Sequence, residues 1–155
     1  MSLEERLEKI RQEKLLRSSE VDWKKRKEKW MTSYESMILE TKTWLLPLAE
    51  KGLLELSEYK KVINEENIGL YELNALRIII GSIEFIIDPM GTILSGTFGR
   101  ADIRNQKTND NKMLLLMGDD IEEAIWKMYI SRVPAKLVNY QKQLLEDVIE
   151  GWLSE

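Results

Sequence analysis

The chain contains neither histidine nor cysteine among its 155 residues. Histidine is the usual base near neutral pH, and cysteine supplies the thiolates used in nucleophilic catalysis and metal binding. Serine–histidine and cysteine–histidine catalysis are therefore impossible within one chain, and so are disulfides. Any chemistry would depend on carboxylates, lysine, tyrosine or hydroxyl groups, so candidate sites are sought among those side chains.

Three carboxylates fall on predicted strands, where acids on adjacent antiparallel strands could hold a magnesium ion. They are Glu84, Asp88 and Asp102. Nucleases often place such acids on a hairpin beside a lysine, but here the residue two positions after Asp102 is Arg104. Arginine does not readily take the proton-transfer role of lysine. We therefore favour a solvated sheet face, predict no metal or other cofactor, and keep a divalent-metal phosphodiesterase as an alternative.

A basic stretch between two tryptophans, VDWKKRKEKW at residues 21–30, suggests nucleic-acid binding. Its cations are Lys24, Lys25, Arg26, Lys27 and Lys29. These cations could contact phosphates while Trp23 and Trp30 stack on bases. The whole chain is acidic, however, with a net charge of −4 and a pI near 5.2, whereas nucleic-acid-binding domains usually have a dominant basic face. We therefore favour packing of the tryptophans and keep nucleic-acid binding as the alternative.

Glycine is unusual inside a predicted strand, and the segment SGTFGRADIR contains Gly96 and Gly99. Glycine weakens a strand unless a bulge or a close backbone approach requires it. These glycines are not followed by the lysine and hydroxyl residue of a phosphate loop. The charged residues after them alternate onto one face and could form an anion- or peptide-docking surface; they are Arg100, Asp102 and Arg104. We favour a structural interpretation, in which the glycines let Trp126 or Trp152 lie across the sheet.

Residues 3–46 are predicted to be helical, because proline and glycine are both absent before Pro47. The segment RSSEVDW contains a capping-box-like pair, so one bent helix and two consecutive helices are both compatible with the sequence. Pro47 disfavours helix at the preceding residue, and Gly52 suits a helix C-terminus. We therefore delimit a helical arm at residues 1–52.

A row of apolar residues runs through this helical arm at a spacing of seven. The row is Leu16, Trp23, Trp30, Met37 and Trp44. Such a repeat is typical of a left-handed helix pair, so the helical arm is predicted to be coiled-coil-like. From residue 30 the apolar stripe is wider, and it could instead lie on a domain core. The predicted contacts with a partner protein are Trp23, Trp30, Tyr34, Met37 and Trp44.

Residues 53–155 are predicted to form an α+β domain. LLELSEYKKVI is interpreted as a short helix and NEENIG as a loop. Apolar alternation predicts a β-meander over residues 70–131, with DPMG as a hairpin connection, TILSGTFGRADIR as the return strand and KMLLLM as a third strand. Residues 120–131 fit either a helix or a fourth strand, and we favour a strand at 125–131. An amphipathic helix at residues 135–153 would pack on one face of the sheet.

These observations predict an α+β fold with a long N-terminal helical arm, a three- or four-stranded antiparallel β-meander, and a C-terminal amphipathic helix packed on the sheet. No apolar run approaches the roughly 18–20 residues that span a bilayer, so we expect a cytoplasmic protein without membrane association. The pattern favours a non-enzymatic protein-interaction module that forms a homo-oligomer, or binds a partner protein, through the helical arm. A small accessory or inhibitor subunit would fit this role.

Overall fold

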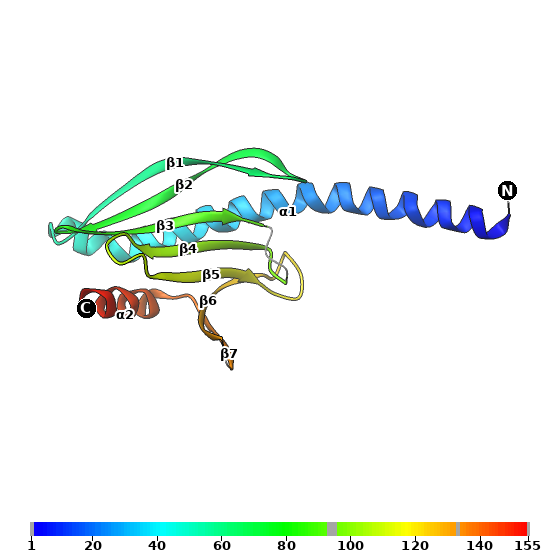
Figure 1. Ribbon diagram of the computed structural model, residues 1–155. Coiled ribbons are helices and arrows are strands. Elements are labelled where there is room, and N and C mark those ends of the chain that lie inside the picture. Colours follow the sequence, from blue (N-terminus) through cyan, green and yellow to red (C-terminus); the bar gives the residue numbers. More distant parts are fainter. Residues whose placement is uncertain (1, 93–95, 133, 155) are drawn as a thin grey trace.

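The computed structural model describes residues 2–92, 96–132 and 134–154. A long helix is followed by seven strands and a second helix (Figure 1). The helices are α1 (Leu3–Glu50) and α2 (Lys142–Leu153). The strands are β1 (Glu55–Glu65), β2 (Gly69–Ile80), β3 (Ile83–Gly91), β4 (Gly99–Asn105), β5 (Asn111–Met117), β6 (Ile125–Arg132) and β7 (Ala135–Asn139).

The strands form one antiparallel sheet in which each strand pairs with the next along the chain. The fold is therefore α+β, with the N-terminal and C-terminal helices that the sequence predicts. The expectation of three or four strands is wrong, because the sheet has seven. Strands β1 and β7 are at its two edges.

The segment LLELSEYKKVI is not a helix, because β1 occupies most of it. Strand β1 pairs with β2 in continuous register, from Glu55 opposite Ile79 to Glu65 opposite Gly69. Its charged residues are compatible with a strand because β1 lies at the edge of the sheet, where much of its surface is exposed. Pairing with β2 therefore overrides a local pattern that resembles a helix.

The part of the predicted meander that precedes DPMG forms two strands, β2 and β3, where the sequence predicts one. Gly81 and Ser82 make a tight turn between β2 and β3, and Ile80 lies opposite Ile83. Gly81 has a φ of 61°, a backbone conformation that glycine adopts at little cost. Apolar residues continue to alternate across this two-residue turn, so the alternation alone could not locate it.

The DPMG segment is not the hairpin connection either. Strand β3 continues through Pro89, which lies opposite Ala101 of β4, and the register shifts between Pro89 and Gly91. Proline cannot donate a ladder hydrogen bond, and strands accommodate it at such irregularities. The strand favoured at 125–131 is confirmed as β6. The helix predicted at 135–153 is divided, since β7 precedes α2.

Helix α1 is a single helix that is neither broken at RSSEVDW nor ended by Pro47. Pro47 lies in the last turn of α1, close to the point where the helix ends before Gly52. Proline has no backbone N–H, so one helical hydrogen bond is lost there, but almost all of the helix lies before it and is unaffected. Although α1 has 48 residues, no helix among the described residues is apolar enough over a sufficient length to cross a membrane.

The core lies between one face of the sheet and the two helices. The second half of α1 contributes Trp30, Tyr34, Met37, Ile38 and Leu45, and α2 contributes Leu145, Ile149 and Trp152. The Trp30 ring lies against Gly99, where an added Cβ would be only 2.1 Å from Trp30 Cε3. The expectation that a tryptophan crosses the sheet at a glycine is therefore met by Trp30, in place of Trp126 or Trp152.

Strands β2 and β3 pair only over a short stretch, from Leu76 opposite Ile87 to Ile80 opposite Ile83. Beyond that stretch the first half of β2 separates from β3 and bows away from it, over α1 (Figure 1). The hydroxyl of Tyr34 on α1 donates a hydrogen bond to the backbone carbonyl of Asn74 in this part of β2. This partly buried bond joins the helix to β2 where β2 has no bonds to β3, so Tyr34 stabilises the separated arrangement of the strands.

We predict that replacing Gly99 by alanine destabilises the protein by about 1–3 kcal/mol, because the new methyl group overlaps the Trp30 ring. Urea unfolding monitored by tryptophan fluorescence measures this change. The matched control is Gly151→Ala in α2, where no atom lies within 4 Å of the added Cβ and alanine favours the helix by up to about 1 kcal/mol. Equal stability of the two variants would contradict the packing of Trp30 on Gly99.

We also predict a loss of stability above pH 10. Burial, as the largest cause, raises the pKa of Tyr34, Tyr71 and Tyr140 above the ordinary value of 10.0. Above pH 10 the unfolded chain releases tyrosine protons that the folded chain keeps, so each tyrosine lowers the free energy of unfolding by about 1.4 kcal/mol per pH unit. Unfolding in urea at several pH values should give a shallower decline for Tyr140→Phe than for the wild type; identical slopes would contradict this account.

Candidate functional site

The structure places three of the five expected partner contacts inside the chain's own core. Trp30 is 0% exposed, and Tyr34 and Met37 are also buried against the sheet. Trp44 is half-buried and packs its ring 5.2 Å from that of Tyr140. A partner could reach these residues only if α1 left the sheet. The row at a spacing of seven therefore attaches α1 to its own domain, where the sequence pattern predicted contacts with another chain.

Trp23, the remaining member of that set, is half-buried beside Arg26. The Arg26 guanidinium lies over the Trp23 ring at 5.3 Å from its centroid and over the Phe98 ring at 5.7 Å. It also donates hydrogen bonds to the carbonyls of Thr92, at 2.8 Å, and Thr97, at 2.6 Å. Arg26 thus connects α1 to the segments that follow β3 and precede β4. Arg26 therefore makes contacts within its own chain, whereas the sequence places it among the residues that could contact phosphates.

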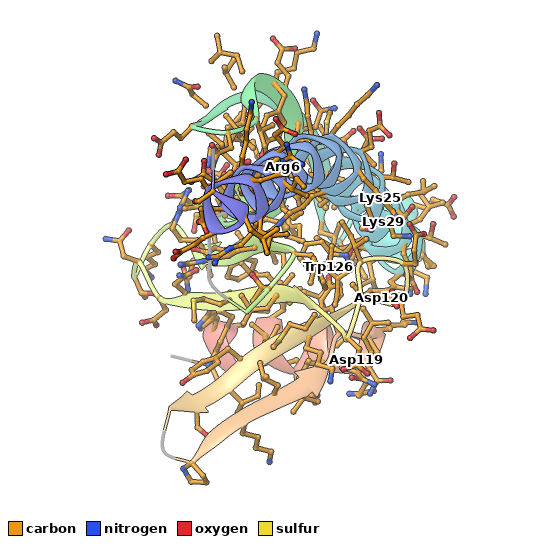
Figure 2. All side chains as sticks on the ribbon, turned by 90° about the vertical axis from the view of Figure 1, so that its right-hand side faces the viewer. Arg6, Lys25, Lys29, Asp119, Asp120 and Trp126 are labelled. Atoms are coloured by element: carbon orange, nitrogen blue, oxygen red, sulfur yellow. The ribbon has the colours of Figure 1, made fainter. Side chains whose placement is uncertain are left out.

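Two more cations of the basic stretch also make contacts within the chain. Lys25 forms an ion pair with Glu122 at 3.2 Å, and Lys27 lies 5.6 Å from the centroid of the Tyr71 ring. Figure 2 shows Lys25 and Lys29 on the same side of the molecule as Asp119 and Asp120, in the acidic segment between β5 and β6. The basic stretch therefore faces acids of its own chain, which lowers its attraction for phosphates.

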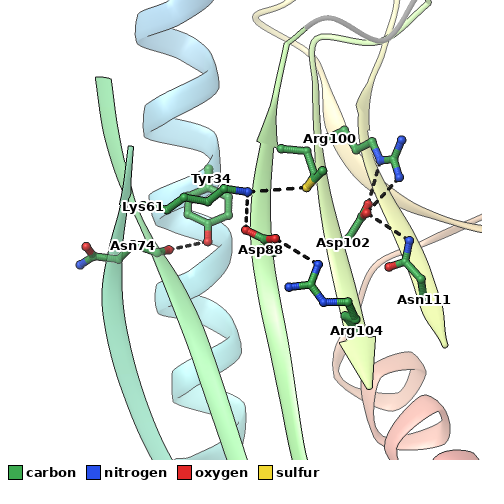
Figure 3. Close-up of polar contacts among 9 residues, drawn as sticks. Tyr34, Lys61, Asn74, Asp88, Arg100, Asp102, Arg104 and Asn111 are labelled. Carbon is green, nitrogen blue, oxygen red and sulfur yellow. Dashed lines mark hydrogen bonds and ion pairs between the residues drawn. The ribbon is translucent and has the colours of Figure 1, made fainter. Parts of the chain in front are cut away.

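Of the three candidate metal-binding acids, Asp88 is held by two cations. It is buried and accepts from Lys61 Nζ at 2.7 Å and from Arg104 at 3.2 Å (Figure 3). Lys61 comes from β1, which is not a neighbour of β3 in the sheet, so this ion pair crosses the place where β2 separates from β3. Asp88 therefore joins parts of the sheet that backbone hydrogen bonds do not join.

The other two acids are likewise paired with arginine. Asp102 lies opposite Asp88 in the register and receives two bonds from Arg100, at 2.8 and 2.9 Å, and one from Asn111 at 3.1 Å (Figure 3). Glu84 pairs with Arg77. Within the described residues, no group of three or more acids could hold a metal ion. The face of the sheet opposite α1 thus carries a ladder of ion pairs. The expectation of a solvated face is wrong for Asp88 and Asp102, which are buried because cations of the same chain neutralise them.

One buried acid was missed in the sequence. Glu65 is the last residue of β1 and is 3% exposed. Its carboxylate accepts a hydrogen bond from the hydroxyl of Tyr71. It also accepts two hydrogen bonds of 2.7 Å from Thr92, one from the backbone N–H and one from the hydroxyl. Tyr71 in turn accepts from Trp30 Nε1 at 3.0 Å. Burial, followed by the bond to Glu65, raises the pKa of Tyr71. The sequence does not indicate that Glu65 is buried, because it lies in NEENIG, which is predicted to be a loop after a short helix.

The part of the chain most open to a partner is the N-terminal extension of α1, defined here as residues 3–13. Figure 1 shows this end of the helix projecting beyond the sheet, away from the other elements. Leu3, Leu7 and Ile10 are spaced to lie on one face of it and are 72%, 56% and 54% exposed. Three apolar side chains in water on one helix face are typical of a surface that packs on another helix.

The comparisons with known proteins give no relative: no family model matches the chain, and no curated protein or solved structure matches it significantly.

We predict that replacing Asp88 by asparagine destabilises the protein by about 1–3 kcal/mol, because Lys61 and Arg104 lose a buried anion while the side-chain shape is kept. Urea unfolding measures the difference. The matched control is Asp119→Asn on the exposed acidic segment, for which we expect a change within about 0.5 kcal/mol. An Asp88→Asn protein as stable as the control would show that the ion pairs do not hold β1 to β3.

Proposed function

We propose that this chain is a non-enzymatic protein-interaction module that self-associates through the N-terminal extension of α1. The observation that carries the proposal is the exposure of Leu3, Leu7 and Ile10 on a helix end that projects from the domain. Most of the stability of a helix in a protein comes from packing against other elements, and a projecting helix has no such packing within its own domain. A second helix packed on the apolar face would supply it.

The ion pairs on the sheet are consistent with a role that involves no catalysis. Asp88, Asp102 and Glu84 are each engaged by cations of the same chain. A general base or a metal ligand needs a free lone pair directed at a substrate or ion. Carboxylates arranged in this way instead connect strands.

The apolar face of the extension gives a rough measure of the association. Burying each of its three side chains contributes about 1–2 kcal/mol, because they are only half to three-quarters exposed at the start. Two copies together gain about 6–12 kcal/mol, against a cost of association of about 4–15 kcal/mol. The self-association is therefore expected to be reversible and concentration-dependent.

We predict that the wild type exceeds its monomer mass of 18.2 kDa in light scattering and that its mass rises with protein concentration. Replacing Leu3, Leu7 and Ile10 together by serine removes the apolar face and should weaken association by at least about tenfold, or about 1.4 kcal/mol. The matched control is Val62→Ser/Leu70→Ser, which removes two exposed apolar side chains from the β1–β2 hairpin.

The control should associate like the wild type. A wild type that stays at 18.2 kDa at every concentration would overturn self-association through the extension. Equal weakening by the control would show that general surface hydrophobicity, and not this helix face, is responsible.

A further inference from the structure

The outer face of α1 carries exposed apolar residues at both of its ends. Besides Leu3 and Ile10, these are Leu39 and Leu46, which are 62% and 49% exposed. Leu39 is 36 residues after Leu3, and Leu46 is 36 residues after Ile10, which is ten turns at 3.6 residues per turn. All four residues therefore lie on one line along the helix, here called the outer line.

The outer line faces away from the sheet. Trp30, whose ring is buried on the sheet, is 20 residues after Ile10, or about five and a half turns, so it lies on the opposite side of the helix. A helix packed along the outer line would lie beside the β1–β2 hairpin, because Leu39 lines a hollow with Glu58 of β1 and Glu72 of β2. The exposure of Leu39 and Leu46, within the half of α1 that is packed on the sheet, shows that this side of the helix is open.

The spacing along the outer line is the same when it is read backwards. Leu3 and Ile10 are seven residues apart, and so are Leu39 and Leu46. We propose that the partner of the N-terminal extension is a second copy of this chain, whose α1 lies antiparallel along the outer line. Leu3 then meets the second copy's Leu46 and Ile10 meets its Leu39, and the two-fold axis repeats both contacts at the other end. This inference rests on the proposed function and adds the surface of the second copy that is bound and the orientation of the two helices.

Charge favours the antiparallel orientation over a parallel one. In a parallel pair each residue of the outer line meets itself, so Lys25, Glu28 and Glu35 would each face a like charge. In the antiparallel register neither Glu28 nor Glu35 lies opposite itself, so the repulsion of the parallel pair is absent at these two positions. Near the two-fold axis Lys25 faces the second copy's Lys24, which is a like charge, but Lys25 is already paired with Glu122 of its own chain.

The length of α1 makes this contact extensive. A helix of 48 residues is about 72 Å long, and the antiparallel register overlaps nearly all of it. The sheets, packed on the opposite sides of the two helices, would remain apart as the outer layers of a sheet–helix–helix–sheet assembly. Each extension would be covered by the sheet-bound half of the other copy's helix.

Disulfide trapping tests the inference directly, since the wild type has no cysteine. Proteins carrying Ile10→Cys and Leu39→Cys singly are mixed, oxidised and run on a non-reducing gel; Leu3→Cys mixed with Leu46→Cys tests the second contact. Both mixtures should give a covalent dimer, because facing residues of packed helices come within disulfide range. Ile10→Cys alone should give none, because its two copies would be about 40 Å apart.

The matched control mixes Ile10→Cys with Leu70→Cys, an equally accessible position outside the outer line, and should give only background cross-linking. Cross-linking of Ile10→Cys with itself would overturn the antiparallel orientation and leave the proposed function standing. A wild type that associates in light scattering while neither mixture cross-links would overturn the register. A wild type that remains monomeric would overturn both proposals.

A second variant separates this contact from one confined to the extension. Leu39→Glu/Leu46→Glu leaves residues 3–13 unchanged and places acids where the second copy's Ile10 and Leu3 would pack. We expect at least a tenfold weaker dimer than in the wild type, whereas Leu53→Glu, exposed but outside α1, should leave it unchanged. An unchanged dimer in the double variant would contradict the outer line as the docking surface.

Discussion

The close approach of Trp30 to Gly99 is the contact on which the rest of the structure depends. Only glycine leaves room for the ring at this point of β4. With its ring there, Trp30 directs Nε1 at Tyr71, which contacts Glu65, and Glu65 binds Thr92 beyond β3. One side chain of α1 thus fixes the helix against β4 and, through a buried series of hydrogen bonds, against β2, the end of β1 and the residue that follows β3. Each polar group in this series of hydrogen bonds has a partner, which offsets part of the cost of burying it.

The separation of β2 from β3 follows from the same packing. The large side chains of α1 occupy the concave space, and the β1–β2 hairpin bows over the helix where it would otherwise continue flat beside β3 (Figure 1). The lost backbone pairing is replaced by the bond from Tyr34 to Asn74 and the ion pair between Lys61 and Asp88. The polar residues that the sequence offers as candidate catalysts are therefore used to hold the sheet around a helix.

The sequence predicts those features that depend on local pattern and misses those that depend on pairing. Helix α1, helix α2 and the strand at 125–131 follow from composition and periodicity. Strand β1 does not, because an edge strand with many exposed charges has no alternation distinct from that of a helix. For the candidate site, the sequence predicts a solvated sheet face, whereas Asp88 and Asp102 are buried in ion pairs. Lys61 can be recognised as a partner of Asp88 only when β1 is known to be a strand. Likewise, no pattern within α1 could reveal that Trp30 is opposite Gly99.

The row at a spacing of seven shows why a heptad does not by itself identify a coiled coil. Seven residues fall about 20° short of two full turns, so the row rotates by about 20° per heptad in a straight helix. From Trp23 to Trp44 the rotation is therefore about 60°, and Trp44 is half-buried where Trp30 and Met37 are buried. Trp23 lies about five turns before the buried Thr41, so its partial exposure comes from its position along the helix and not from the rotation. The row crosses the buried face of a helix packed on a sheet. Residues that are 36 apart do not rotate, which is why the exposed leucines at the two ends of α1, and not the tryptophans, remain aligned over its whole length.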